Sequence, residues 1–276
     1  MPGHVGAIVW SSFLLSTSLY LAAAALFWVM ARPRAIPRLA PAWPASLLAL
    51  GAVLQLLCLV VCSVADRRCP VYSLRTALGI VSLVGVVGFT TLSRGRRFEA
   101  LGGFVAASAA LFGVAAQAIS ARPDTPNQRW LMAIHITTNL LGGGLLLVAG
   151  GAASFYLWHA RRLRHRHLLG QGAQLPPLES LDAVVHRLLW IGVPLLTVGM
   201  LTGRAAIKLV QIVTAGEKLR ATLGVASWLV LLAVLALRHL ARWRGRRLAL
   251  ATLLGAIGIF ALIVLYVGRA LVGDGL

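Results

Sequence analysis

The stretch LALATLLGAIGIFALIVLYVG, residues 248–268, contains 21 residues without one charged side chain. A transmembrane helix needs about 20 apolar residues to cross the hydrocarbon core of a bilayer, so this run predicts a spanning helix near the end of the chain. Similar apolar runs, broken by charges and prolines, predict eight such helices, at roughly 5–31, 42–65, 73–93, 99–120, 130–160, 184–204, 221–238 and 248–272. The fold class that follows is an all-α integral membrane protein, a bundle of about eight transmembrane helices.

The composition points the same way. Hydrophobic residues make up 59% of the 276 residues and charged residues 12%, whereas soluble domains carry roughly 25% charged residues. Mean hydropathy is +0.86. We expect one membrane domain over residues 1–276, surrounded by the lipid bilayer. The net charge of +19 would suggest nucleic-acid binding in a soluble protein, but these charges occupy short clusters between apolar runs. We therefore expect no nucleic-acid partner.

The basic residues are distributed unevenly between the two sides of the predicted bundle. With eight spans, the loops after the first, third, fifth and seventh spans share one side, and that side holds 16 of the 26 Lys and Arg residues. Cytoplasmic loops carry an excess of Lys and Arg. The distribution therefore places these loops in the cytoplasm and both termini outside it. We expect the membrane to be a bacterial cytoplasmic membrane.

Two short patterns occur once in each half of the chain. ALGIVS at residues 77–82 precedes RGRR at 94–97, and TLGVAS at 222–227 precedes RGRR at 244–247. In the predicted topology both patterns join an inward-running helix to an outward-running one. The bundle can accordingly be divided into two parallel four-helix repeats, although apolar sequences often match by chance.

One predicted span has a polar stripe that contains a histidine. His135, Thr138, Asn139 and Gly142 lie at the spacing of one helical face. A neutral imidazole is a good axial ligand for haem iron, and the glycine run 142–144 permits close approach of a helix or a flat ligand. The alternative is that His135 and Asn139 hydrogen-bond a neighbouring helix. The residues alone leave both interpretations open.

Other polar and aromatic residues favour structural roles. His159 lies in an arginine-rich cluster and is predicted to be solvated, while His186 is expected to cap the sixth helix or lie at the membrane interface. Gln55 and Cys58 share a face that favours helix packing. We expect four tryptophans near helix ends to anchor the membrane interface; they are Trp130, Trp158, Trp190 and Trp228. No nucleophile–base pair, carboxylate dyad, phosphate loop or CxxC is present in the sequence, so nothing here favours an enzyme or a zinc site.

Several segments, taken in order, resemble one family. Their order is similar to that of the cytochrome c assembly proteins, the CcsA/HemX-like membrane proteins that handle haem. The matching segments are Arg68-Cys-Pro-Val-Tyr-Ser-Leu74, the His135 helix ending in Tyr156-Leu-Trp-His-Ala-Arg-Arg162, Leu178-Glu-Ser-Leu-Asp182 with His186-Arg187, Gly192-Val-Pro-Leu-Leu-Thr-Val-Gly199 with Gly203, and Trp243-Arg-Gly-Arg-Arg247.

The chain also departs from this family. Members that attach haem carry a tryptophan-rich outer loop between the sixth and seventh helices, but residues 204–227 contain no tryptophan. The family histidine of the second helix is absent near Leu56, and that of the seventh would align with Ala236, one turn before His239. The outer histidine after the last helix is absent as well, with Arg269 nearby. Of the family's four haem-ligand positions, only His135 matches cleanly.

The resemblance implies a membrane protein of cytochrome c biogenesis that binds or handles haem b at the outer face. His135 would be the axial iron ligand, with Asn139 beside it and His239 as the next candidate. Cationic side chains would pair with the haem propionates; they are Arg204, Lys208 and Arg269. A second cytochrome c maturation membrane protein is the expected protein partner.

The alternative is a HemX-like accessory or regulatory protein that no longer binds haem. Either role is haem handling or assistance rather than catalysis. An unrelated transporter is less favoured, because no span carries a relay of buried carboxylates.

Overall fold

The computed structural model describes residues 3–30, 42–66, 74–92, 99–118, 130–164, 178–207 and 215–272. In these ranges the chain is helical apart from the short turn 241–245. The helices are α1 (Gly3–Met30), α2 (Ala42–Asp66), α3 (Leu74–Leu92), α4 (Glu99–Ala118), α5 (Trp130–Arg164), α6 (Leu178–Ile207), α7 (Ala215–Leu240) and α8 (Arg246–Val272). The predicted all-α fold of eight helices is confirmed.

Six of these helices are long and apolar enough to cross a bilayer, and two are shorter. Among the described residues the long spans lie in α1, α2, α5, α6, α7 and α8. The apolar parts of α3 and α4 cover Thr76–Thr91 and Leu101–Ala116, and at 1.5 Å per residue each extends about 24 Å. The chain is a multi-pass membrane protein, although two of the predicted spans are shorter than a typical hydrocarbon core.

Two helices begin earlier than predicted, because charged residues were taken as their limits. α6 begins at Leu178 rather than near 184, and α7 begins at Ala215 rather than near 221. The extra turn and a half of α6 contains Asp182, whose carboxylate is paired with an arginine of α7. His186 consequently lies inside α6 and is not a cap. Ionisable residues can remain in membrane helices where they have protein partners.

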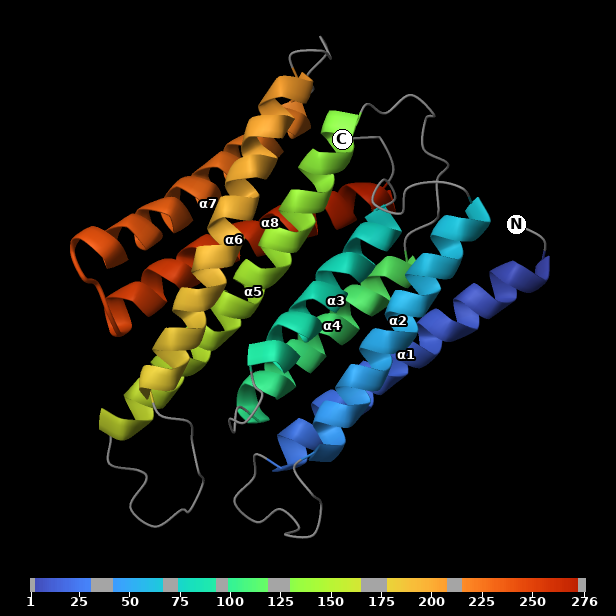
Figure 1. The fold of residues 1–276 in the computed structure, drawn as a ribbon, viewed down its shortest axis with the longest axis horizontal. Helices are drawn as coiled ribbons and strands as arrows, with labels where there is room; N and C mark the ends of the chain where they lie inside the picture. Colours follow the sequence, from blue (N-terminus) through green and yellow to red (C-terminus); the bar gives the residue numbers. More distant parts are fainter. Residues whose placement is uncertain are drawn as a thin grey trace. The chain divides into compact units, whose positions relative to one another are not determined.

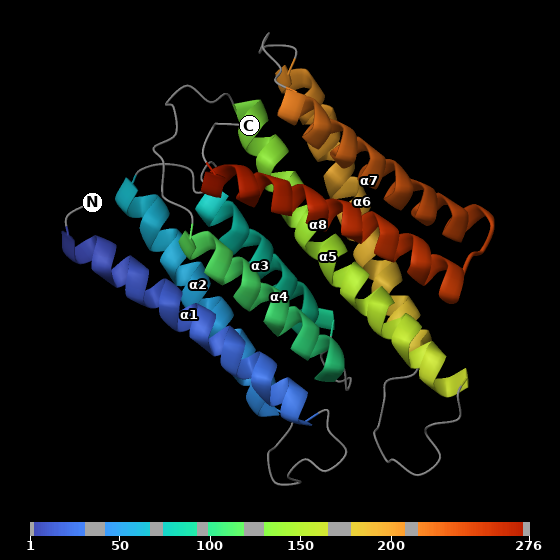
Figure 2. The same cartoon turned by 180° about the vertical axis from the view of Figure 1, so that it is seen from behind.

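The chain divides into two compact units of four helices each (Figures 1 and 2). In the first unit α1 packs against α2 and α4, and α3 packs against the same two helices. In the second unit α5 packs against α6 and α8, and α7 packs against the same two helices. Both units therefore have the neighbour order of an up-and-down four-helix bundle. ALGIVS lies in α3 and TLGVAS in α7, the third helix of each unit, whereas RGRR at 94–97 lies outside the described residues. Any such bundle has this helix order, so the duplication stays a prediction.

A buried polar network joins three helices of the first unit. Tyr20 Oη donates to Gln55 Oε1 at 2.6 Å, and Ser82 Oγ donates to the same oxygen at 3.2 Å. The Gln55 amide donates in turn to the Gly79 carbonyl at 3.0 Å. Gln55 is 1% exposed, so leaving its amide unpaired in an apolar interior would be costly. The predicted packing role of Gln55 is confirmed, and Cys58 is also buried.

The arrangement of the loops across the membrane can be tested by reporter fusions. We expect fusions at Arg97, Arg164 and Arg244 all to report cytoplasm, since the loops that hold them carry the arginine excess. Paired alkaline phosphatase and fluorescent-protein fusions at each position would give this result. A periplasmic signal at any one of the three would contradict the predicted topology.

Candidate functional site

Helices α5 and α6 of the second unit pack unusually closely because glycines line their interface. A Cβ atom added to Gly142 would lie 2.9 Å from the Gly192 carbonyl oxygen and 3.1 Å from the Leu196 nitrogen. The two nearest atoms at this position belong to the backbone of α6, which cannot move aside as a flexible side chain can. On the opposite helix, a Cβ on Gly192 would meet the Leu146 side chain at 2.6 Å. Small residues that let backbones approach are typical of helix contacts in membranes.

The polar stripe of α5 lies in this interface. Antiparallel packing brings His135 and Asn139 opposite the last turns of α6, where the ring of His135 lies over Gly203 and the amide of Asn139 over Gly199. Any side chain larger than hydrogen at either glycine would occupy the space of these groups. The pattern Gly199-xxx-Gly203 thus makes room for the two polar side chains. We call this part of the second unit, formed by His135, Asn139, Gly199 and Gly203, the His135 end.

The hydrogen bonds of His135 determine which ring nitrogen carries the proton. Nδ1 lies 2.6 Å from the Gly199 carbonyl oxygen, which can only accept, so Nδ1 is the protonated nitrogen and donates. The Asn139 amide nitrogen is 3.1 Å from the same Nδ1, but it donates to the His135 backbone carbonyl at 2.6 Å. We therefore assign the contact between the two side chains as packing. Nε2 keeps its lone pair and has no hydrogen bond to another described residue.

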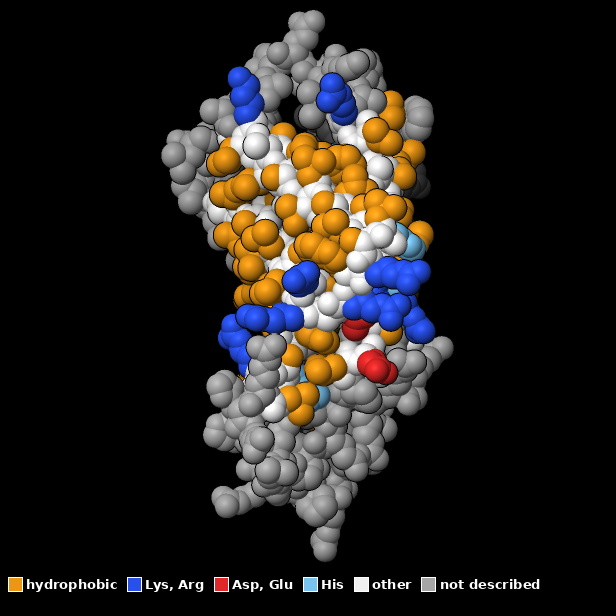
Figure 3. Space-filling model, turned by 90° about the vertical axis from the view of Figure 1, so that its left-hand side faces the viewer, with side chains coloured by type: hydrophobic (Ala, Val, Ile, Leu, Met, Phe, Trp, Pro, Cys, Tyr) orange, Lys and Arg blue, Asp and Glu red, His pale blue; other side chains and the backbone are white. Residues whose placement is uncertain are grey.

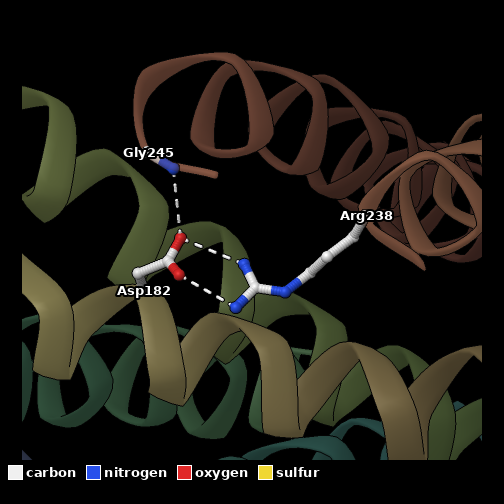
Figure 4. Close-up of polar contacts among 3 residues, drawn as sticks. All are labelled: Asp182, Arg238 and Gly245. Atoms are coloured by element: carbon white, nitrogen blue, oxygen red, sulfur yellow. Dashed lines mark hydrogen bonds and ion pairs between the residues drawn. The ribbon is translucent and has the colours of Figure 1, made fainter. Parts of the chain in front are cut away.

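At the other end of α6 a carboxylate joins three elements. Asp182 accepts two hydrogen bonds from the Arg238 guanidinium, at 3.1 and 2.9 Å, and a third from the Gly245 backbone nitrogen at 3.3 Å (Figure 4). The side chains of Arg238 and Asp182 are only 11% and 18% exposed. Gly245 has a φ of +70°, a conformation that glycine adopts without strain. This ion pair therefore holds α7 and the turn 241–245 against α6.

Three aromatic rings pack together one turn beyond this ion pair. The ring of His239 is 5.0 Å from that of Trp190, edge to face, and 6.0 Å from that of His186. His186 lies thirteen residues before Gly199 on α6, a separation of about 20 Å along the axis. The two candidate ligands His135 and His239 therefore belong to different ends of the unit and cannot bind one iron together. We call the part formed by Asp182, His186, Trp190, Arg238 and His239 the Asp182 end.

Exposed arginines are concentrated toward the Asp182 end. In Figure 3 a band of Lys and Arg side chains borders a wide apolar surface, and the acidic and histidine side chains lie close to that band. The exposed basic residues of this part of the chain come from the last turn of α5, from the first third of α6, from the turn 241–245 and from the start of α8; they are Arg161, Arg187, Arg242, Arg244, Arg246 and Arg247.

Most other predicted site residues are placed less closely together. Arg204 is exposed and follows Gly203, the residue beneath the His135 ring, but it has no described contact with His135. The side chain of Arg269 and all of Lys208 lie outside the described residues. Nothing in the described structure brings these three cations together around the histidine.

Further predictions about single side chains were wrong, among them the expected place of Trp190 near a helix end, since it is the thirteenth of the 30 residues of α6. His159, expected to be solvated, is 5% exposed and its ring lies 6.3 Å from that of Phe155. Trp228, expected near a helix end, lies in the middle of α7, where its Nε1 donates to Thr197 Oγ1 of α6 at 2.9 Å. Both residues look interfacial in sequence because of their type and neighbours, but tertiary packing determines their position.

Comparison with known proteins identifies the family of this chain. The sequence model of the cytochrome c assembly protein family matches residues 42–275, which is most of the chain. The chain belongs to the cytochrome c assembly protein family. No curated protein and no solved structure matches it significantly. The suspected relationship is thus confirmed, and the match includes both units apart from α1, with five of the six long apolar spans.

The sequence segments that resemble the cytochrome c assembly family contact one another in the structure. The Leu-Asp segment supplies Asp182, and the Trp-x-Gly turn supplies Gly245, 63 residues later, whose nitrogen binds that carboxylate. The glycines of residues 192–203 accommodate Leu146, Asn139 and His135 of the long α5. In this family member the sequence pattern therefore corresponds to one packed set of contacts within α5–α8.

Proposed function

We propose that this cytochrome c assembly protein binds haem b at the outer face of the cytoplasmic membrane, with His135 as the axial ligand of the iron. The observation that supports this is the hydrogen bond from His135 Nδ1 to the Gly199 carbonyl at 2.6 Å. Histidines that bind metals usually donate the other ring N–H to a carbonyl or carboxylate, which sets the tautomer and orients the ring. In this arrangement Nε2 is the nitrogen left to bind iron.

The chemistry of the residues fits haem at this end. His135 is partly exposed rather than sealed in the core, and one imidazole leaves the iron five-coordinate or with a weak sixth ligand. The bound group would supply an iron centre and two carboxylates. Arg204, with Arg269 as a further candidate, would pair with those carboxylates by charge-assisted hydrogen bonds. Asn139 holds the turn of α5 that carries the ligand, through its bond to the His135 carbonyl.

A second function has its own support. The same hydrogen bonds of His135 and Asn139 link α5 to α6 and would stabilise the bundle without any ligand. Residues 204–227 also lack the tryptophans that would cover a flat macrocycle. A family member that keeps the fold and assists another membrane protein of cytochrome c maturation would have these features. A protein partner would then carry the haem attachment step.

Haem titration separates the two functions. Under the proposal, the protein purified in detergent takes up one equivalent of haem and shows a Soret band distinct from that of free haem in the same micelles. An accessory protein that has lost haem binding gives only the spectrum of free haem. The ferrous carbon monoxide adduct should form readily, since a five-coordinate iron has an open position.

Covalent haem attachment should be absent whichever function holds. We expect that this protein alone cannot restore c-type cytochromes in a strain that lacks its own maturation system, because residues 204–227 contain no aromatic platform for the macrocycle. Haem staining of denaturing gels checks this, with an intact family system as the positive control. Clear restoration of stained cytochrome would show that attachment does not need those tryptophans.

A further inference from the structure

Arg220, near the start of α7, is a buried cation that neither function uses. It is the sixth residue of α7 and is 8% exposed. Its guanidinium carbon lies 4.8 Å from the centre of the Tyr266 ring of α8. The Nε atom is buried and has no hydrogen-bond partner, and no ion pair joins Arg220 to another described side chain. The sequence shows it only as one of several basic residues beside a predicted span.

A buried guanidinium of this kind needs a negative partner. Removing an ion from water is costly unless an opposite charge and hydrogen bonds replace the lost hydration, and a cation–π contact recovers only a small part of that cost. The acidic side chains described in the second unit are Glu179 and Asp182, and both belong to the Asp182 end. Residues 205–216 contain no Asp or Glu, and Glu217 is the acid nearest to Arg220 in sequence.

Arg220 and His135 lie at similar depths in the second unit. Trp228 of α7 bonds to Thr197 of α6, and Arg220 lies eight residues, or about 12 Å, from Trp228 toward the start of α7. On α6, Gly203 beneath the His135 ring lies six residues, or about 9 Å, from Thr197 toward the end of that helix. Both displacements run toward the same end of the unit, because α6 and α7 are antiparallel.

We propose that Arg220 is a binding site for an oxyanion, a carboxylate or phosphate group of a ligand that enters at the His135 end. The Tyr266 ring lies 4.8 Å from the guanidinium carbon and takes none of its N–H groups in a hydrogen bond, so these remain to form charge-assisted hydrogen bonds with an anion. The start of α7 adds the partial positive charge of a helix N-terminus. Two molecules in this setting carry such a group: haem, through its propionates, and an anionic phospholipid, through its phosphate. The site does not depend on iron ligation by His135.

Two probes distinguish these sources. The first compares hemin with hemin dimethyl ester, whose propionates are blocked, by absorbance titration. The second measures retention of phosphatidylglycerol against phosphatidylcholine by native mass spectrometry of the purified full chain. For Arg220→Gln we expect about a tenfold or larger loss of affinity for one of the two oxyanions. The matched control is Lys218→Gln, which removes one exposed charge from the same turn and should change neither measurement.

A loss for hemin but not for its ester assigns Arg220 to a propionate. A loss of phosphatidylglycerol alone assigns it to a lipid phosphate, and because this probe contains no iron it reports on Arg220 even if haem does not bind. Arg220→Met is the second variant, for the case that Gln impairs folding. Its melting temperature without anion should be no lower than that of the wild type, because an uncompensated buried charge is removed.

Two results would overturn the proposal. In the first, Arg220→Gln and Lys218→Gln behave alike with both probes. In the second, Glu217→Gln lowers the melting temperature and the double variant Glu217→Gln/Arg220→Gln restores it. That outcome would show that Glu217 is the counter-charge and that the chain satisfies Arg220 itself.

Discussion

Replacing Asp182 by Ala should lower the free energy of unfolding of the second unit by about 3 kcal/mol, the cost typical of removing one partner from a buried ion pair. The variant leaves the Arg238 guanidinium, which is 11% exposed, without its counter-charge. It also removes the acceptor of the Gly245 nitrogen, so the turn 241–245 loses its bond to α6. The measurement is equilibrium unfolding in detergent micelles, followed by circular dichroism.

The double variant tests whether the pair acts as a unit. Because Asp182→Ala and Arg238→Ala remove the same interaction, the two changes together should cost less than the sum of the single changes, by about 2 kcal/mol. Arg244→Ala is the matched control, since Arg244 belongs to the turn 241–245 that Asp182 binds, but its side chain is exposed. If Asp182→Ala is no more destabilising than Arg244→Ala, the carboxylate does not hold the α7–α8 hairpin on α6.

The sequence predicted the helices well because one physical requirement dominates. An apolar run long enough to cross a bilayer has few alternatives to a helix, since every backbone group must be paired within the segment. The limits of α6 and α7 were less accurate for a related reason. Charged residues normally mark the membrane boundary, but Asp182 and Arg220 lie inside helices against partners from α7 and α8.

The sequence predicted the candidate site only for residues that are close together in the sequence and share one helical face. His135 and Asn139 share a helical face, and the structure brings them together at Gly199 and Gly203. The pairing of Asp182 with Arg238 joins residues 56 positions apart, and no local pattern indicates such a pair. Arg220 was missed because its type and position match those of an ordinary loop cation; a tyrosine 46 residues later gives no signal in the sequence.

The central claim is that His135 is the iron ligand of a haem site, and its removal should abolish haem binding. His135→Ala deletes the one histidine whose other ring nitrogen is anchored on a helix carbonyl, so Nε2 is lost and no second histidine lies at that end among the described residues. His239→Ala is the matched control. It removes a histidine of α7 whose ring packs on Trp190, at the opposite end of the second unit from His135.

The measurement is haem content per protein and the absorption spectrum after purification of the two variants beside the wild type. The account predicts that His135→Ala loses the bound haem and its Soret band, while His239→Ala retains both at the wild-type level. Melting temperatures of the two variants without haem show that each is folded. Unchanged haem in a folded His135→Ala variant would contradict the account.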